Sequence, residues 1–193
     1  MKFLIVTGFI CLAVTSFCQK TVMPLFTEIS SSEYKSCNTI YNYLIDTAAY
    51  LKNKGILVIT IKTKKLIFKD DYSHENFKTF KYLGRVKNCN FLLLLKEEFN
   101  REKYYLINKT TGKKYTLAGK PIFNADFKSI ACLSKPGTDE QQSIQICKIK
   151  NELVYKKKQI PGKKNTFFNS SSCINKSYLY LKDNIGKYWK LNY

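Results

Sequence analysis

NKTTGKKYTLAGKPIFNAD, residues 108–126, contains two different local signals in one short stretch. Its first half places a turn at Gly112 between two strand-like runs, and its second half leads through Pro121 and Phe123 into another turn. Glycine suits turn positions that need a positive φ, and proline is confined to strand starts, edges and turns. The stretch therefore predicts the end of one antiparallel unit and the beginning of the next.

Strand-like runs continue on both sides of this stretch, from Gly55 to the C-terminus. They are rich in Ile, Val, Tyr, Phe and Thr, and polar turn residues separate them, as expected for strands. The runs are GILVITIK, LIFKD, FKYLGRV, NFLLLLKEEF, KYYLIN, KYTLAG, SIACLS, SIQICKI, LVYKKKQI, SYLYLKD and KYWKLNY. The pattern predicts an all-β protein built from antiparallel sheets.

Polar hairpin turns recur along this region at intervals of about 48, 39 and 35 residues. They are centred near Lys64, Gly112, Asn151 and Gly186. A period of roughly 40–45 residues with four short strands in each unit is typical of propeller blades.

Two full units fit the repeat, at 80–120 and 121–161, with partial units at 55–79 and 162–193. Propellers usually close with about four to eight blades. We therefore expect an incomplete or open β-propeller-like domain with exposed edge strands. Lys-rich strand ends such as YKKKQ are one way to protect such edges from pairing with other chains.

One unit boundary resembles a known repeat. PIFNADFKSIACLS, residues 121–134, is similar to the P-x-[WF]-S-P-D-G-K-x-I-A-F-x-S repeat of TolB-type, WD-like propellers. The matching positions are Pro121, Phe123, Asp126, Lys128, Ile130, Ala131 and Ser134. The chain departs from the repeat at Asn124, Ala125 and Phe127, and Phe127 replaces the glycine of the tight turn after Asp126.

The wider order of motifs resembles uncharacterised secreted bacterial proteins with such repeats. It consists of FKYLG, LINKTTGK, PIFNAD and IQI within residues 55–193. The resemblance implies a propeller-like fold and implies no activity.

Residues 1–18, MKFLIVTGFICLAVTSFC, are typical of an export signal, with Lys2 before an apolar run. Ser16 and Cys18 fit cleavage before Gln19, so we expect one domain at 19–193 in the periplasm or outside the cell. No transmembrane segment is expected after cleavage. A lipoprotein acylated at Cys18 is the alternative, and the bulky Phe17 before it argues against acylation.

The segment 31–53 has two interpretations. Ser30 with Glu33 fits a capping box, and apolar residues follow at helical spacing, which favours a helix ending near Gly55. These apolar residues are Cys37, Ile40, Tyr41, Leu44, Ile45, Ala48 and Leu51. The alternative is a strand, IYNYLI, followed by a loop.

Removal of the signal leaves five cysteines, namely Cys37, Cys89, Cys132, Cys147 and Cys173. Export permits disulfides, but the odd number leaves at least one free thiol. Cys132 and Cys147 fall in neighbouring predicted strands, so a disulfide between them is one interpretation. We favour buried free thiols, which pack as small hydrophobic side chains.

The chain is strongly basic, with 33 Lys and Arg against 14 Asp and Glu, a formal net charge of +19. Such an excess attracts anionic surfaces. The densest basic cluster, and the candidate binding site for an anionic envelope component, is Lys156, Lys157, Lys158, Lys163 and Lys164. Lys113, Lys114 and Lys120 would extend it if they lie on the same rim. The other lysines are scattered, which favours an ordinary solvated surface, and export disfavours nucleic acid as a partner.

No pattern identifies a catalytic or metal-binding site, and no cofactor is predicted. DDYSHEN, which contains the only histidine, His74, could collect a cation but is more typical of a polar connection between strands. KEEFNRE offers Glu97, Glu98 and Glu102, which could serve acid and base roles in glycoside cleavage, but it is more typical of a charged hairpin end.

The sequence thus favours an exported, non-catalytic β-protein that binds or scaffolds a component of the cell envelope or of the exterior. Its ligand and protein partners are not specified by any motif. Two alternatives are a polyanion or envelope-surface binder acting through the lysine cluster, and a hydrolase that uses Glu97, Glu98 or Asp126.

Overall fold

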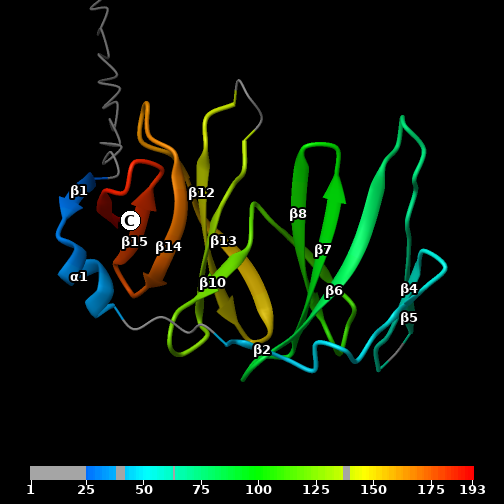
Figure 1. The fold of residues 1–193 in the computed structure, drawn as a ribbon. Helices are drawn as coiled ribbons and strands as arrows, with labels where there is room; N and C mark the ends of the chain where they lie inside the picture. The colour runs from blue at the N-terminus through cyan, green and yellow to red at the C-terminus, as the bar shows by residue number, and fades with distance from the viewer. Residues whose placement is uncertain (1–24, 38–41, 63, 137–139) are drawn as a thin grey trace, which may run out of the picture.

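The computed structural model describes residues 25–37, 42–62, 64–136 and 140–193, and Figure 1 shows their strands as antiparallel sheets standing side by side. Sheet I contains β3 (Lys52–Asn53), β4 (Ile56–Thr60) and β5 (Lys65–Lys69). Sheet II contains β2 (Leu44–Ile45), β6 (Lys78–Val86), β7 (Phe91–Glu98), β8 (Arg101–Asn108) and β9 (Lys114–Leu117). The expected signal peptide, 1–18, lies outside the described residues.

The second half of the chain forms two further sheets. Sheet III contains β10 (Pro121–Phe123), β11 (Ser129–Leu133), β12 (Ser143–Lys150) and β13 (Leu153–Pro161). Sheet IV contains β14 (Phe168–Ile174), β15 (Tyr178–Asp183), β16 (Tyr188–Asn192) and the N-terminal β1 (Leu25–Ile29). The prediction of an all-β protein is confirmed, and within the described residues no helix is long and apolar enough to span a bilayer.

The four predicted turns each join two paired strands. The turn near Lys64 joins β4 to β5, and the other three join β8 to β9, β12 to β13 and β15 to β16. Gly112, Asn151 and Gly186 have φ angles of 70°, 50° and 90°, as turn residues in the left-handed region do. In sheet III the turn follows the third strand, β12, whereas in sheet IV it follows the second, β15, because the fourth strand of sheet IV is the N-terminal β1.

Neighbouring sheets pack face to face through three apolar cores. Sheets I and II share Leu57, Ile59, Ile61, Phe68, Tyr82, Leu92, Leu94 and Ile107. Sheets II and III share a core that includes Phe91, Leu93, Leu106, Phe123, Ile130 and Cys132, and sheets III and IV share one that includes Ala131, Ile144, Leu181 and Leu191. The run FLLLL in β7 is buried throughout because alternate side chains face opposite sheets.

The N-terminal segment completes sheet IV, which the sequence did not predict. β1 pairs with β16 from Leu25 opposite Asn192 to Ile29 opposite Tyr188. A disulfide joins Cys37 to Cys173 on β14, with the two Cα atoms 6.1 Å apart. The first and the last described segments of the chain are therefore linked both by strand pairing and by a covalent bond. Cys89, Cys132 and Cys147 are free, and the interpretation of Cys132 and Cys147 as buried free thiols is confirmed.

The helix predicted through 37–51 is wrong. Helix α1 covers only Ser31–Ser36, with the Ser30 side chain accepting a hydrogen bond from the Glu33 amide as the capping box predicted. β2 and β3 follow, and residues 38–41 of the alternative strand lie outside the described residues. Asp46, at a φ of 54°, interrupts any helical path, and Leu51 is 79% exposed instead of packing on an apolar face.

The tight turn after Asp126 forms although Phe127 replaces glycine. Phe127 has a φ of 58°, and its side chain is buried against Phe123 in the core between sheets II and III. Asn124 fixes the turn, because its side-chain oxygen accepts from the Ser129 amide and its carbonyl accepts from the Phe127 amide. Burial of the ring offsets the strain of the left-handed backbone.

Candidate functional site

A pocket of about 810 Å³ lies where sheets II, III and IV meet. Its walls come from β8 and the β9–β10 connection, from β10 and β11, and from the first half of β14. Tyr43, Ile122, Leu133 and Phe167 contribute apolar surface. Small-molecule sites are typically concave, mostly apolar and about 300–1,000 Å³ in volume, so the pocket has the size of a ligand site.

Gly119 allows the β9–β10 connection to form one wall. A Cβ at this position would lie 1.8 Å from the carbonyl oxygen of Leu133 on β11, which no side chain could tolerate. The neighbouring Ala118 amide donates to Oε1 of Gln145 at 2.8 Å. The connection is therefore held directly against sheet III, and the pocket wall has a fixed backbone.

Gln142 holds the opposite wall. Its side chain is buried, accepts from the Phe168 amide at 2.8 Å and donates to the Phe168 carbonyl at 2.8 Å. The same Nε2 also donates to the Ser134 carbonyl at 3.0 Å. Gln142 thus acts as a partner strand would for the start of β14, and it fixes sheet IV to sheet III beside the pocket.

Charged side chains gather on the sheet II and III walls. Glu102 accepts from Lys135 Nζ at 2.7 Å and from the Tyr104 hydroxyl at 3.0 Å. The hydrogen bond from Lys135 is the largest influence holding the pKa of Glu102 below its usual range, with further contributions from Tyr104 and Lys120 that outweigh burial. Burial and the Glu102 carboxylate raise the pKa of Tyr104. With Lys120, also in the lining, the group carries one positive charge more than negative near neutral pH.

Ser171 on β14 belongs to the pocket lining, but its hydroxyl is enclosed by the protein and unsatisfied. Its Oγ is buried and has no hydrogen-bond partner among the described residues. Pairing of β14 with β15 shifts register on both sides of Ser171, so this part of the strand is irregular. Buried hydroxyls are usually hydrogen-bonded. The unsatisfied hydroxyl coincides with the irregular part of β14 and offers no contact to the pocket.

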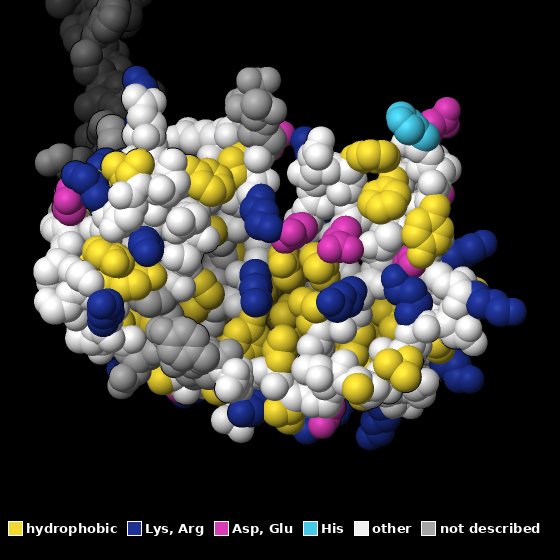
Figure 2. Space-filling model, in the orientation of Figure 1, with side chains coloured by type: hydrophobic (Ala, Val, Ile, Leu, Met, Phe, Trp, Pro, Cys, Tyr) yellow, Lys and Arg dark blue, Asp and Glu magenta, His cyan; other side chains and the backbone are white. Residues whose placement is uncertain are grey.

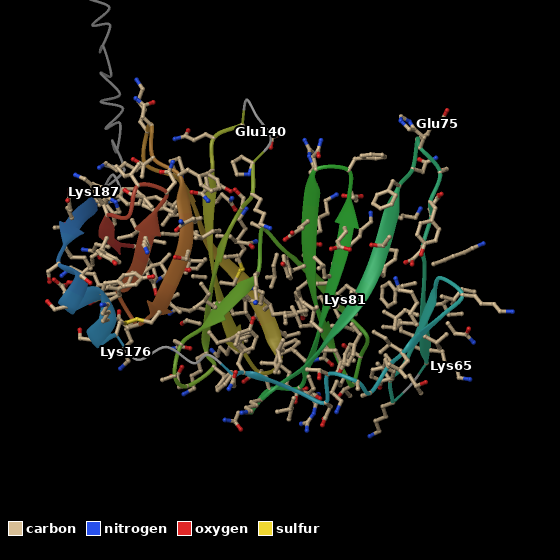
Figure 3. The ribbon with its side chains drawn as sticks, viewed as in Figure 1. Lys65, Glu75, Lys81, Glu140, Lys176 and Lys187 are labelled. Atoms are coloured by element: carbon tan, nitrogen blue, oxygen red, sulfur yellow. A yellow bond between two sulfur atoms is a disulfide. The ribbon has the colours of Figure 1, made fainter. Side chains whose placement is uncertain are left out.

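A smaller hollow of about 310 Å³ adjoins the pocket and shares Glu102, Ala118, Ser134 and Lys135 with it. At its other end, Arg101 on β8 pairs with Glu140 before β12 at 2.9 Å. Figure 2 shows a notch in which basic and acidic side chains lie close together above an apolar floor. Glu140 is labelled near the end of the β11–β12 connection in Figure 3.

The predicted lysine cluster lies along the outer edge of sheet III. Lys156, Lys157 and Lys158 are exposed on the edge strand β13, and Lys157 is the extra residue of a bulge, since Lys156 pairs with Cys147 and Lys158 with Ile146. A bulge and several lysines on an edge strand hinder pairing with another chain. Lys164 follows the strand and is also exposed.

Two lysines of the cluster lie over aromatic rings of sheet IV. Lys157 Nζ is 5.0 Å from the ring centre of Tyr193, and Lys163 Nζ is 3.3 Å from that of Trp189. Burial, together with Lys148 and Lys158, lowers the pKa of Lys157. Lys114 lies over Phe68 of sheet I instead. The structure thus places these lysines against different sheets, and Lys120 lines the pocket.

The carboxylates of KEEFNRE occupy the β7–β8 hairpin end. Glu98 forms ion pairs with Lys96 and with Lys103, the latter at 2.7 Å, and these two lysines hold its pKa below the usual range, the Lys103 hydrogen bond most strongly. Glu97 accepts from the Thr79 hydroxyl, and Asp126 accepts from the Lys128 amide in the turn before β11.

The side chains of Asp70 and His74 in DDYSHEN contact different neighbours and do not face a common point. Asp70 is buried and accepts from Lys52, Tyr72 and the Phe80 amide, and these bonds lower its pKa although burial, the largest single influence, acts to raise it. His74 packs on Phe99, with ring centres 5.7 Å apart. Across the described ranges, no group of three or more His, Cys, Asp and Glu side chains is arranged to hold a metal ion.

Sequence reasoning did not identify the pocket. Gln142, Lys135 and Ser171 lie in unremarkable polar stretches, and only the fold brings them to one place. The run SSS in an otherwise strand-like segment is the one local sign of β14's irregularity. Comparison with known proteins adds no assignment, because no protein-family model, curated protein or solved structure matches this chain.

Proposed function

We propose that this is an exported, non-catalytic binding protein of the cell envelope or the exterior, and that its ligand occupies the pocket between sheets II, III and IV. The observation that carries the proposal is the pocket itself, with its mostly apolar wall and few polar groups. Sites of this composition bind small molecules by burying an apolar body and orienting it with a few polar contacts.

The lining favours a ligand with an apolar or aromatic body and one anionic group. Lys135 is neutralised by Glu102, whereas Lys120 has no carboxylate within ion-pair distance among the described residues. A carboxylate, sulfonate or phosphate beside Lys120 would restore charge balance.

A binding role is favoured over hydrolysis by the state of the acids. A general acid at neutral pH needs a raised pKa. Glu98 and Glu102 have lowered pKa values because lysines donate to them. Both therefore remain ionised and engaged with cations, which argues against a general-acid role for either.

We also propose that the sheets form an open, propeller-like stack related to the TolB-type repeat. Support comes from the meander order of strands in sheets II and III and from the face-to-face packing of successive sheets. The turn at Asn124, Asp126 and Phe127 opens the second strand of sheet III at the position of the repeat's D-G turn.

Polyanion binding through Lys156, Lys157, Lys158, Lys163 and Lys164 is a weaker proposal. Lys157 and Lys163 lie over Tyr193 and Trp189, which reduces the charge available to a partner. Lys156, Lys158 and Lys164 remain exposed. Salt-dependent binding to heparin, lost on charge reversal of these three, would support this alternative.

The pocket is tested by titration with 8-anilinonaphthalene-1-sulfonate, an aromatic sulfonate whose fluorescence rises in apolar sites. We expect saturable binding that is lost when Ile122→Trp fills the pocket and weakens about tenfold in Lys120→Glu. Ile185→Trp, at a turn position 72% exposed, is the matched control and should bind as the wild type does. Thermal unfolding of each variant separates pocket loss from misfolding, and unchanged binding by both pocket variants would contradict the proposal.

A further inference from the structure

The outward faces of the first and last sheets, sheet I and sheet IV, differ in whether another element covers them. On the outward face of sheet IV, helix α1 packs beside β16, with the Tyr34 and Tyr188 rings 4.6 Å apart and Lys190 bonded to Glu33 at 2.6 Å. At the other end, the outward face of sheet I is covered by none of the described residues, as the right-hand side of Figure 1 shows.

The uncovered face of sheet I carries aliphatic side chains. In β4, Leu57 and Ile59 face sheet II, so Ile56, Val58 and Thr60 face outward. Val58 lies opposite Ile67 on β5, and the exposed fractions of Ile56, Val58 and Ile67 are 38%, 38% and 68%. Three neighbouring aliphatic side chains on one face of the sheet thus remain in contact with solvent.

Lysines surround this aliphatic group at both ends of the hairpins. Lys65 and Lys69 flank Ile67 on the same face, Lys54 lies in the β3–β4 turn, and Lys62 lies in the β4–β5 turn, whereas Lys64 of that turn reaches over Gly112 of sheet II. None of the first four lies within ion-pair distance of a carboxylate in the part of the chain that the structure describes. Of the two acids that follow β5, Asp70 is directed inward to Lys52, and Asp71 pairs with Lys78 of β6.

The figures show the same distribution of charge. In Figure 2 dark blue side chains project from the sheet I end of the molecule, and Figure 3 labels Lys65 there. Lys176 and Lys187 are labelled at the opposite end, on sheet IV, where Lys187 is paired with Glu28 at 3.1 Å. Basic residues are thus found at both ends, but among the described residues they surround an uncovered aliphatic face only at sheet I.

We propose that the outward face of sheet I, defined by Ile56, Val58, Ile67, Lys65 and Lys69, docks on an anionic lipid surface. The aliphatic side chains enter the boundary between headgroups and acyl chains, while the long lysine side chains reach outward to anionic headgroups. Each lysine near such a surface contributes about a fivefold gain in binding. This inference does not depend on the pocket, which lies among the other three sheets.

The composition of the face favours lipid over a protein partner. Protein interfaces are depleted in lysine and use aromatic and arginine side chains as anchors. Here the charges are all lysines, which bind as point charges without directional pairing, and the apolar residues are aliphatic. A second copy of the chain would place two basic faces against each other, which charge repulsion opposes.

The test is sedimentation with vesicles of phosphatidylcholine, with and without phosphatidylglycerol. We expect binding only to the phosphatidylglycerol vesicles, weakening as salt rises. Ile67→Asp should reduce binding at least tenfold, and the double variant Lys65→Glu with Lys69→Glu should reduce it more. All three positions are exposed, so the fold should persist.

Two matched variants test whether this face, rather than net charge, is responsible. Lys156→Glu with Lys158→Glu makes the same charge change on β13, and Ile185→Asp makes the same apolar-to-acid change on an exposed turn. Both should retain most of the binding. Equal loss in these controls, or no binding of the wild type to phosphatidylglycerol vesicles, overturns the proposal.

Insertion is measured separately from adhesion. Ile67→Trp places an indole on the face, and its emission should shift to the blue and be quenched by brominated acyl chains when vesicles are added. Ile185→Trp should show neither change. Binding without a blue shift at position 67 would mean that the aliphatic group does not enter the lipid, and it would also overturn the proposal.

Discussion

Sheets III and IV each have four strands, but they are assembled in different ways. Sheet III is one continuous meander from Pro121 to Pro161. Sheet IV joins three C-terminal strands to β1 from the other end of the chain, and it adds the Cys37–Cys173 disulfide. Residues close together in the sequence are therefore enough to form sheet III, whereas sheet IV depends on contacts between distant parts of the sequence.

The pocket is formed by walls from both sheet III and sheet IV, so it depends on how each of these sheets is assembled. Its β10 and β11 walls belong to sheet III, and its β14 wall belongs to sheet IV. Phe168 at the start of β14 is held by Gln142 of sheet III and stacks on Phe26 of β1 with ring centres 5.5 Å apart. Loosening the chain ends should therefore weaken sheet IV and open the pocket, while sheet III remains formed.

The largest effect is expected from the disulfide. Cys37→Ser with Cys173→Ser removes a link that closes a separation of 136 residues, and this should lower the free energy of unfolding by about 3–5 kcal/mol. Urea unfolding checks this. Reductant should bring the wild type to the value of the double variant and should leave the variant unchanged. Equal stability of the two proteins would show that β1 is held by strand pairing alone.

A smaller effect is expected from Asp183, which fixes the β15–β16 turn inside sheet IV. Its buried carboxylate accepts from Trp189 Nε1 at 2.8 Å and from the amides of Ile185 and Lys187. Asp183→Asn keeps the shape but replaces an ionised acceptor, and it should lower stability by about 1–3 kcal/mol near neutral pH.

The pH dependence of Asp183 gives an independent check. Burial alone would raise its pKa, but the hydrogen bonds from Trp189 and the turn amides hold it below the usual range. Because the folded pKa lies below the unfolded value of about 3.9, the stabilisation is present above that pH and is lost as pH falls through the folded pKa. Asp183→Asn should lose less unfolding free energy than the wild type as the pH is lowered. If urea unfolding shows the same decrease at low pH in both proteins, Asp183 is not the group responsible.

The stability of the turn between β10 and β11 in sheet III should depend on the backbone conformation of Phe127. Phe127→Ala and Phe127→Gly both remove the buried ring, but the φ of 58° favours glycine. We expect the glycine variant to be more stable than the alanine variant by about 1 kcal/mol in thermal or urea unfolding. At Phe123, which lies in the strand β10, the order should reverse. The same order at both positions would exclude strain at Phe127.

Much of the sheet structure could be predicted because it is local. The alternation in GILVITIK and the turns at Gly112, Asn151 and Gly186 each depend on a few adjacent residues. LFTEI at 25–29 becomes a strand only because β16 offers an edge, and no nearby turn indicates that pairing. The apolar positions from 37 to 51 matched a helical spacing, but that spacing does not exclude the short β2 and β3.

The candidate site could not be predicted because its residues share no local pattern. Lys120 stands out in the sequence only by its charge. Gln142 bonds to Phe168, and Ser171 joins the pocket lining, only when sheet IV docks on sheet III. The lysine cluster of β13 was visible because it is dense in sequence, and the structure shows that density along the chain does not make a single charged surface.

The smallest change in stability is expected where the segment after β13 contacts sheet IV. Lys163 lies over Trp189 of sheet IV, whereas Lys164 is exposed. Lys163→Met should lower stability by about 0.5–1 kcal/mol through loss of the cation–π contact, and Lys164→Met, the matched control, should change it by less than about 0.5 kcal/mol.

Trp189 is the only tryptophan, so its emission reports this contact directly. Lys163→Met should alter the emission of the folded protein, and Lys164→Met should not. If neither variant changes emission or stability, Lys163 does not hold the link after β13 against sheet IV. The docking of the two sheets then rests on Gln142 and the apolar core between them, and Gln142→Ala should become the variant that separates sheet IV from sheet III.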